Sequence, residues 1–298
     1  RAAPADALTS GTHKIVVQDP RFGAVERKFM LTVPSGRAPR TGMPLVLGFH
    51  GQDDTPQTWK SRSSVQAEAY LHKFVAVFPA GLEEDGNFTD TTWNVNSGGD
   101  SSTCVPNEMA WANQKTSCVR VGETGPCNWS SCYSDVEFIA QLIRKLETSL
   151  CLDSQRYFAV GESNGGMMIY ELISRLPSVF LAATVVYALP LVGYEMGSKF
   201  QVATNLTMAR RTSLLVLHDR QDDVIPPSGG LMQGWLYVSG KRHWGLWAAI
   251  HGCSTTATEV KRALSGGQNN VTCYEHPGCA VPDGARDGAR GAAGGQTP

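Results

Sequence analysis

Short, continuous apolar runs alternate with helix-like segments along most of this chain of 298 residues. An apolar run of four to eight residues ended by turn residues is typical of a strand buried on both faces. Two segments rich in β-branched residues, 14–19 and 27–34, precede these runs and predict an opening hairpin. The runs themselves lie at 44–50, 74–79, 156–161, 182–188 and 213–218. Because alternating strands and helices require crossover connections, the sequence predicts an α/β fold with a mostly parallel sheet between helix layers.

The clearest helix is predicted over 134–150, where one face is apolar. Ser134 and Glu137 form an S-x-x-E pattern in front of it, which predicts a capping box. The segment 58–73 and the late segment 242–253 are also helix-like. This length is common for one α/β domain, so we expect a single domain over residues 1–283.

Residues 81–133 interrupt the alternation, since they are polar, show little periodicity and contain four cysteines. A long irregular insert needs crosslinks to be stable, so we expect disulfides to staple the region 81–151. We also expect Cys253 to pair with Cys273 or Cys279, which would tie the late helix to the last strand. Residues 284–298 are almost all Gly, Ala and Arg, and they predict a disordered tail.

The cysteines and the glycosylation motifs together predict an extracellular protein. Because the chain starts at Arg1 rather than Met, we also expect a cleaved leader. The cysteine count is eight, an even number, and there is no C-x-x-C pair to favour zinc. Four N-x-S/T sequons are present, at Asn87, Asn128, Asn205 and Asn270. The net charge of −1 gives no reason to expect nucleic acid or a membrane surface as partner. The longest apolar stretch, 179–194, is too short to span a bilayer.

The segment GESNG, residues 161–165, places a serine between two glycines where a predicted strand meets a predicted helix. Glycines there allow the strand and the helix to approach closely, which would lift Ser163 to the top of the sheet. A bare G-x-S-x-G pattern arises by chance, but the strand–turn–helix context is the one that a nucleophilic serine requires. The free backbone N–H of Asn164, at the start of that helix, is a candidate oxyanion donor.

Two other strand ends carry candidate site residues. The run 44–50 ends in His-Gly, where we expect a second oxyanion donor in the backbone N–H of Gln52, with His50 in a structural role. The run 213–218 enters an acid-rich loop containing His218, Asp219, Asp222 and Asp223. These side chains resemble a metal cluster, but an activated serine needs only one acid to orient a histidine. We therefore expect no metal and no cofactor.

The segments PLVLGFHG, GESNGGMM and LHDRQDDVIP, with TTWNVNSGG and CYSDVEFI between them, resemble the secreted esterases grouped with polyhydroxybutyrate depolymerases and feruloyl esterases. The likeness covers about residues 12–280. It implies an α/β-hydrolase fold, Ser163 as nucleophile, and ester hydrolysis outside the cell. The H-G-x-x-D-x-x-x-P spacing of that family implies Asp222, four residues before Pro226, as the triad acid in preference to Asp223. Asp219 replaces the glycine of that pattern.

The triad histidine is the open element of this interpretation. The chain order Ser, Asp, His leaves His243, His251 and His276. His243 and His251 lie in a predicted helix, where structural roles are expected. No histidine occurs after Cys279, where the family has its own, so no position carries over, and His276 is a candidate substitute.

Two functions follow from these residues. One is a serine esterase acting through an acyl-enzyme on a feruloyl-polysaccharide of the plant cell wall or on a hydroxyalkanoate polyester. The alternative is a secreted, non-catalytic binding protein that lacks the triad histidine. The insert should wall the pocket and brings Trp93, Trp111 and Trp129, whose indoles suit stacking on an aromatic acyl group. Trp93 is the candidate substrate contact, because it lies in the segment that resembles the family.

Overall fold

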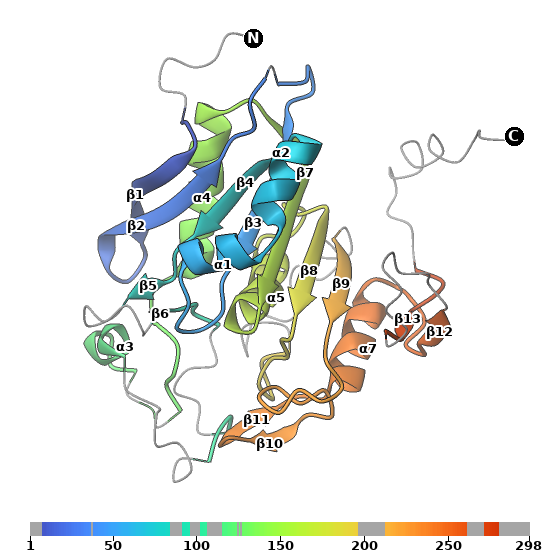
Figure 1. Ribbon diagram of the computed structural model, residues 1–298. Coiled ribbons are helices and arrows are strands. Elements are labelled where there is room, and N and C mark those ends of the chain that lie inside the picture. Colours follow the sequence, from blue (N-terminus) through green and yellow to red (C-terminus); the bar gives the residue numbers. More distant parts are fainter. Residues whose placement is uncertain are drawn as a thin grey trace, which may run out of the picture.

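The computed structural model of the chain is shown in Figure 1. The structure describes residues 8–36, 38–83, 91–95, 102–105, 115–123, 125, 127–195, 212–260 and 271–279. The predicted tail 284–298, Trp111 and the sequons at Asn87, Asn205 and Asn270 lie outside the described residues.

A seven-stranded sheet forms the centre of the molecule, in the order β1-β2-β4-β3-β7-β8-β9. Its strands are β1 (Gly11–Asp19), β2 (Gly23–Thr32), β3 (Met43–Phe49), β4 (Val75–Pro79), β7 (Leu152–Glu162), β8 (Ala182–Val186) and β9 (Ser213–Leu217). β1 and β2 form the predicted antiparallel hairpin, β2 is antiparallel to β4, and the remaining neighbours are parallel. The predicted mostly parallel sheet is confirmed.

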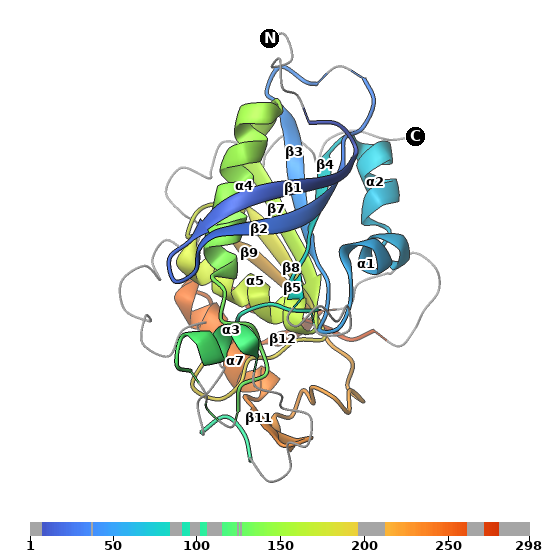
Figure 2. The ribbon, with the colours of Figure 1, turned by 90° about the vertical axis from the view of Figure 1, so that its left-hand side faces the viewer.

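Helices cover both faces of this sheet (Figure 2). On one face lie α4 (Asp135–Ser149) and α5 (Asn164–Arg175), and on the other lie α1 (Pro56–Arg62) and α2 (Val65–His72). A further helix, α7 (Gly240–Ile250), lies beside β9. The helix-like segment 58–73 is thus two helices, which break at Ser63 and Ser64.

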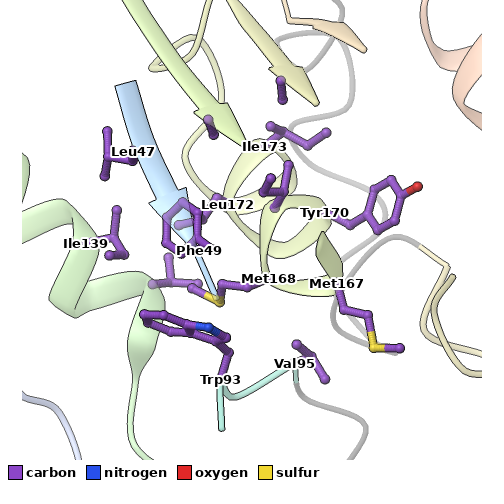
Figure 3. Close-up of a cluster of buried hydrophobic side chains, with 14 of the residues drawn as sticks. Leu47, Phe49, Trp93, Val95, Ile139, Met167, Met168, Tyr170, Leu172 and Ile173 are labelled. Carbon is purple, nitrogen blue, oxygen red and sulfur yellow. The ribbon is translucent and has the colours of Figure 1, made fainter. Parts of the chain in front are cut away.

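The core lies between the sheet and the α4–α5 layer (Figure 3). Leu47 and Phe49 of β3 meet Ile139 of α4 and Leu172 of α5, and all four side chains are fully buried. Such side chains contribute about 1.5–3 kcal/mol each when removed from water. The helical spacing read in 134–150 therefore identified a true core face.

The predicted capping box at Ser134 is wrong. Ser134 is the N-cap of α4, but its side chain makes no capping hydrogen bond. Its backbone N–H instead donates to Asp19 Oδ2 at 2.7 Å. Asp19, at the end of β1, therefore accepts the Ser134 N–H, which the capping-box pattern would have bonded to the Glu137 side chain.

The described parts of the insert are β5 (Leu82–Glu83), β6 (Thr91–Thr92), the helix α3 (Thr116–Arg120) and the adjoining loops. Two disulfides, Cys104–Cys127 and Cys118–Cys132, staple it, and a third joins Cys253 to Cys279. These three pairs confirm the expected crosslinks of the insert and of the C-terminal segment. Figure 1 shows β5, β6 and α3 at the end of the sheet where β7, β8 and β9 finish.

Cys151 and Cys273 remain unpaired, which corrects the expectation that the disulfides of the region 81–151 include Cys151. Cys151 directly precedes β7, so it lies at the end of the sheet opposite to the insert that it was expected to staple. The sequon at Asn128 is also buried, and its Nδ2 donates to the Glu123 carbonyl at 2.9 Å. The folded protein therefore does not present this asparagine for glycosylation. Among the described residues, no helix has the length and apolar character needed to cross a bilayer.

Candidate active site

Ser163 occupies a strained turn between β7 and α5. Its backbone has φ 51° and ψ −125°, which a non-glycine residue adopts only at a cost of about 1–3 kcal/mol. Its side chain is partly exposed, whereas the neighbouring residues of α5 are buried. The turn therefore raises a serine hydroxyl at the carboxyl end of a central strand, as the G-x-S-x-G pattern predicts.

The glycines of this turn are required by packing. A Cβ atom on Gly161 would lie 2.6 Å from the Gly165 carbonyl oxygen. A Cβ atom on Gly165 would collide with the backbone carbonyls of Phe49 and His50. The start of α5 consequently packs directly on the end of β3, which brings the Ser163 turn beside the loop that follows β3.

The loop after β3 carries Gly51 and Gln52. A Cβ atom on Gly51 would lie only 3.5 Å from the Cβ of Ser163, so these two backbones are close neighbours. As the first residue of α5, Asn164 has a backbone N–H with no acceptor inside the helix. The predicted oxyanion donors, the N–H groups of Gln52 and Asn164, thus belong to the two segments that meet at Ser163.

His50 is a buried structural residue. Gly81 N–H donates to its Nε2 at 2.9 Å, which requires that Nε2 carry no proton. Nδ1–H then donates to the Gly51 carbonyl at 2.7 Å. Burial lowers the pKa of His50 to about 4, although the hydrogen bond to Gly51 opposes this. The neutral ring joins the loop after β3 to the segment after β4.

Asp222 lies in the loop after β9, two strands from β7 in the sheet. Its Oδ1 accepts the backbone N–H groups of Val224 and Ile225 at 2.9 and 2.8 Å. Its Oδ2 lies 3.3 Å from Nε2 of His218, which also donates to the Ile225 carbonyl at 2.7 Å. These contacts hold the carboxylate rigidly beside an imidazole. In the described part of the chain, no three His, Cys, Asp or Glu side chains converge as metal ligands would.

None of the described histidines is hydrogen-bonded to Ser163. His276 follows β13 (Cys273–Glu275), which pairs with β12 (Thr258–Val260), and its Nδ1 lies 2.9 Å from the Ser254 carbonyl. Figure 1 shows this pair on the far side of α7 from β7. His243 is completely buried in α7, and its ring meets Tyr170 edge-on at 4.4 Å. His251 caps the end of α7, as expected of a structural residue.

Trp93 is not placed to contact a substrate, because its side chain is 0% exposed. Its indole packs edge-on against Phe49, with ring centroids 5.3 Å apart, deep in the core of Figure 3. Its Nε1–H donates to the His50 carbonyl at 2.9 Å. Trp129 is also buried, and packs against Trp235 of the hairpin formed by β10 (Gly230–Met232) and β11 (Trp235–Tyr237).

Arg62 is a residue of this region that the sequence analysis missed. It lies at the end of α1 and contacts both Asp54 and Glu162. Burial is the largest single influence on the pKa of its guanidinium and lowers it, but the hydrogen bonds and charges of the two carboxylates together outweigh burial and raise the pKa. The only sign of this contact in the sequence was Glu162, the acidic residue inside the GESNG segment.

A small cavity lies beside the first turns of α5, between Met167, Tyr170, Val95 and the segment 190–194. Its volume is about 10 Å³, which is room for roughly one water molecule. An aromatic acyl group does not fit there, so this cavity is not the substrate pocket.

Comparison with known proteins yields esterases. No family model matches the chain. Feruloyl esterase B of Piromyces equi is 24% identical over 255 residues, which cover 84% of this chain but only 39% of that protein. Feruloyl esterase C of Emericella nidulans is 24% identical over 271 residues, covering 88% of this chain and 77% of that protein. An acetyl xylan esterase structure from Aspergillus awamori matches with a TM-score of 0.56 and 15% identity, over 89% of this chain and 88% of the other.

The sheet order, the helix layers and the strained serine after a central strand define an α/β-hydrolase fold, and the matched acetyl xylan esterase structure supports this fold. Within that class, the sequence relatives confirm the resemblance to the feruloyl esterase group. The resemblance to polyhydroxybutyrate depolymerases stays a prediction.

Proposed function

We propose that the protein is a secreted serine esterase that hydrolyses carboxylic esters through an acyl-enzyme. The strained turn at Ser163 carries this proposal, because strain of this kind persists where function requires it. The adjoining Gly51–Gln52 loop and the rigid Asp222 carboxylate support it. Three disulfides support an extracellular setting.

In the proposed mechanism, Ser163 Oγ attacks the ester carbonyl carbon while its proton passes to a histidine base. The N–H groups of Gln52 and Asn164 stabilise the oxyanion of the tetrahedral intermediate. The alcohol leaves with the proton from the histidine. A water molecule then attacks the acyl-serine, and the histidine takes the proton of the water and returns it to Ser163 Oγ as the acid leaves. Asp222 orients and stabilises the histidine.

His218 and His276 are the two histidines that we compare as the base. His276 Nδ1–H donates to the Ser254 carbonyl, and His218 Nε2–H donates to the Ile225 carbonyl. When each ring is neutral, its other nitrogen is therefore unprotonated and can accept a proton. His218 is the one beside Asp222. Substituting each by alanine and measuring kcat identifies the base, since removing it should lower kcat by several orders of magnitude.

We propose a feruloyl-type ester of a plant cell-wall polysaccharide as substrate, because two relatives carry that name, with a hydroxyalkanoate ester as the comparison. The protein and its Ser163→Ala variant are incubated with a fluorophosphonate probe, and the adduct is mapped by mass spectrometry. We expect labelling at Ser163 alone and none in the variant. Turnover of methyl ferulate, p-nitrophenyl acetate and a 3-hydroxybutyrate dimer then ranks the ester classes. Folded protein that is neither labelled nor active would refute the esterase proposal.

A further inference from the structure

One guanidinium bridges the two segments that meet at Ser163. Arg62 Nη1 donates to Glu162 Oε2 at 3.0 Å, and its Nη2 contacts both Glu162 Oε1 and Asp54 Oδ2, the latter at 2.5 Å. The contact with Glu162 uses two nitrogens and two oxygens, which is the strongest geometry for an arginine–carboxylate pair.

The two carboxylates belong to the two walls of the candidate oxyanion site. Glu162 directly precedes Ser163, and its Oε1 lies 3.6 Å from the position of a Cβ on Gly51. Asp54 ends the loop that carries Gln52. The Asp54 carbonyl accepts Thr91 Oγ1–H at 2.6 Å, and Asp53 N–H donates to the Thr91 carbonyl at 2.9 Å.

Hydrogen bonds to Thr91 and to the His50 ring also hold this loop, but they do not join it to the Ser163 turn. Asp53 has φ 56°, a backbone conformation that costs energy for a non-glycine residue. Gly51 has no side chain with which to pack. The contact through Arg62 is therefore a direct side-chain connection between the loop and the residue before the nucleophile.

Arg62 also offsets negative charge next to the place where the oxyanion would form. Glu162 and Asp54 bring two negative charges close to the site where an oxyanion would form, and Arg62 offsets one of them. Without it, the carboxylates would repel each other and disfavour the oxyanion.

We propose that Arg62 is a positioning residue, which holds the Gln52 loop and the Ser163 turn at the separation that the oxyanion requires. This inference rests on the proposed esterase function. The simpler alternative is a partly exposed ion pair with no effect on the reaction, since many such pairs contribute little even to stability.

The test compares Arg62→Gln with Arg144→Gln. Arg144 is the matched control, because it also forms a partly exposed pair with a glutamate, Glu137, at 3.1 Å, on the outer surface of α4. For each protein we would measure kcat and KM on p-nitrophenyl acetate, the rate of fluorophosphonate labelling, and the urea midpoint of unfolding. Arg62→Lys and the double variant Arg62→Gln/Glu162→Gln complete the set.

We expect Arg62→Gln to lower kcat and the labelling rate about tenfold or more, with KM changed less than threefold, because oxyanion stabilisation acts in the transition state. Arg62→Lys should lie between, since it keeps the charge but loses the two-pronged contact. The double variant should recover part of the loss by removing one carboxylate. Arg144→Gln should match the wild type.

Several results would overturn the inference. A folded Arg62→Gln variant with kcat and labelling rate within twofold of the wild type would show that the ion pair does not position the site. Equal losses in Arg62→Gln and Arg144→Gln would assign the effect to general stability. If Arg62→Gln does not fold, a fully active Arg62→Lys refutes the positioning geometry. A wild-type protein without labelling or turnover refutes the proposed function, and this inference with it.

Discussion

The side-chain amide of Asn164 pairs with both backbone polar groups of Trp93. Trp93 N–H donates to Asn164 Oδ1 at 2.6 Å, and Asn164 Nδ2–H donates to the Trp93 carbonyl at 3.2 Å. Both residues are buried. The following residue, Asn94, donates its N–H to Asp135 Oδ2 at 2.7 Å, and Asp135 forms a buried ion pair with Arg27. The residue after the candidate nucleophile is thus tied to the insert and, through it, to α4 and β2.

We predict that Asn164→Ala lowers the free energy of unfolding by about 2–4 kcal/mol, because it leaves two buried backbone groups without this partner. Gln141→Ala is the control, since Gln141 makes the same two bonds to Gln18, both at 2.9 Å, at the surface. Water replaces those bonds, so the control should lose no more than about 1 kcal/mol. Urea unfolding measures both, and equal losses would contradict the role of burial.

Gly165→Ala should prevent correct folding or abolish labelling of Ser163, because the added methyl group meets backbone atoms of Phe49 and His50 that cannot move aside. Gly245→Ala, in the middle of α7, is the matched substitution, since its Cβ would meet nothing closer than 3.9 Å. It should stabilise the protein by up to about 1 kcal/mol through helix propensity. Soluble yield and thermal melting distinguish the two. A well-folded, reactive Gly165→Ala protein would show that the close contact is not required.

His243 should make stability depend on pH. Burial lowers its pKa to about 3, whereas the unfolded chain binds a proton below about pH 6.5. Stability is therefore lost as the pH falls from 6.5 toward 3. Between pH 7.5 and 5, this residue alone should lower the free energy of unfolding by about 2 kcal/mol.

His243→Phe should remove that part of the pH dependence, whatever its effect on stability at a single pH. His72→Gln is the control, because His72 is exposed on α2, where its ring contacts the exposed side chain of Glu68. Urea unfolding of the three proteins at pH 7.5 and 5 provides the comparison. The same loss between the two pH values in wild type and His243→Phe would contradict the prediction.

Alkylation without reduction should modify two of the eight cysteines. Cys151 is exposed and Cys273 partly buried, so we expect Cys151 to react with iodoacetamide faster than Cys273. The other six are held in three disulfides and should react only after reduction. Peptide mass spectrometry counts the modified residues. Modification of Cys104 or Cys253 in unreduced, folded protein would contradict the assigned pairs.

The sequence predicted what depends on local pattern. Apolar runs identified the strands, and the GESNG segment predicted the turn at Ser163, because strand burial and glycine packing involve residues close in the chain. Interactions between distant residues were not predictable. Asp19 accepts the N–H of Ser134 at the start of α4, although the two residues are 115 positions apart in the chain. Trp93 lies in a polar segment that suggested a surface, yet Asn164 and His50 satisfy its polar groups inside the core.

Trp93→Phe tests which role that tryptophan has. Phenylalanine keeps an aromatic ring against Phe49 but loses the indole N–H that donates to the His50 carbonyl. The smaller ring and the lost hydrogen bond should lower the free energy of unfolding by about 2–4 kcal/mol. Because His50 precedes the Gln52 loop, we also expect kcat to fall by a similar factor on every ester. A substrate contact would instead affect aryl esters most. Kinetics on methyl ferulate and p-nitrophenyl acetate separate the two, and a loss confined to the ferulate ester would contradict the buried, structural role.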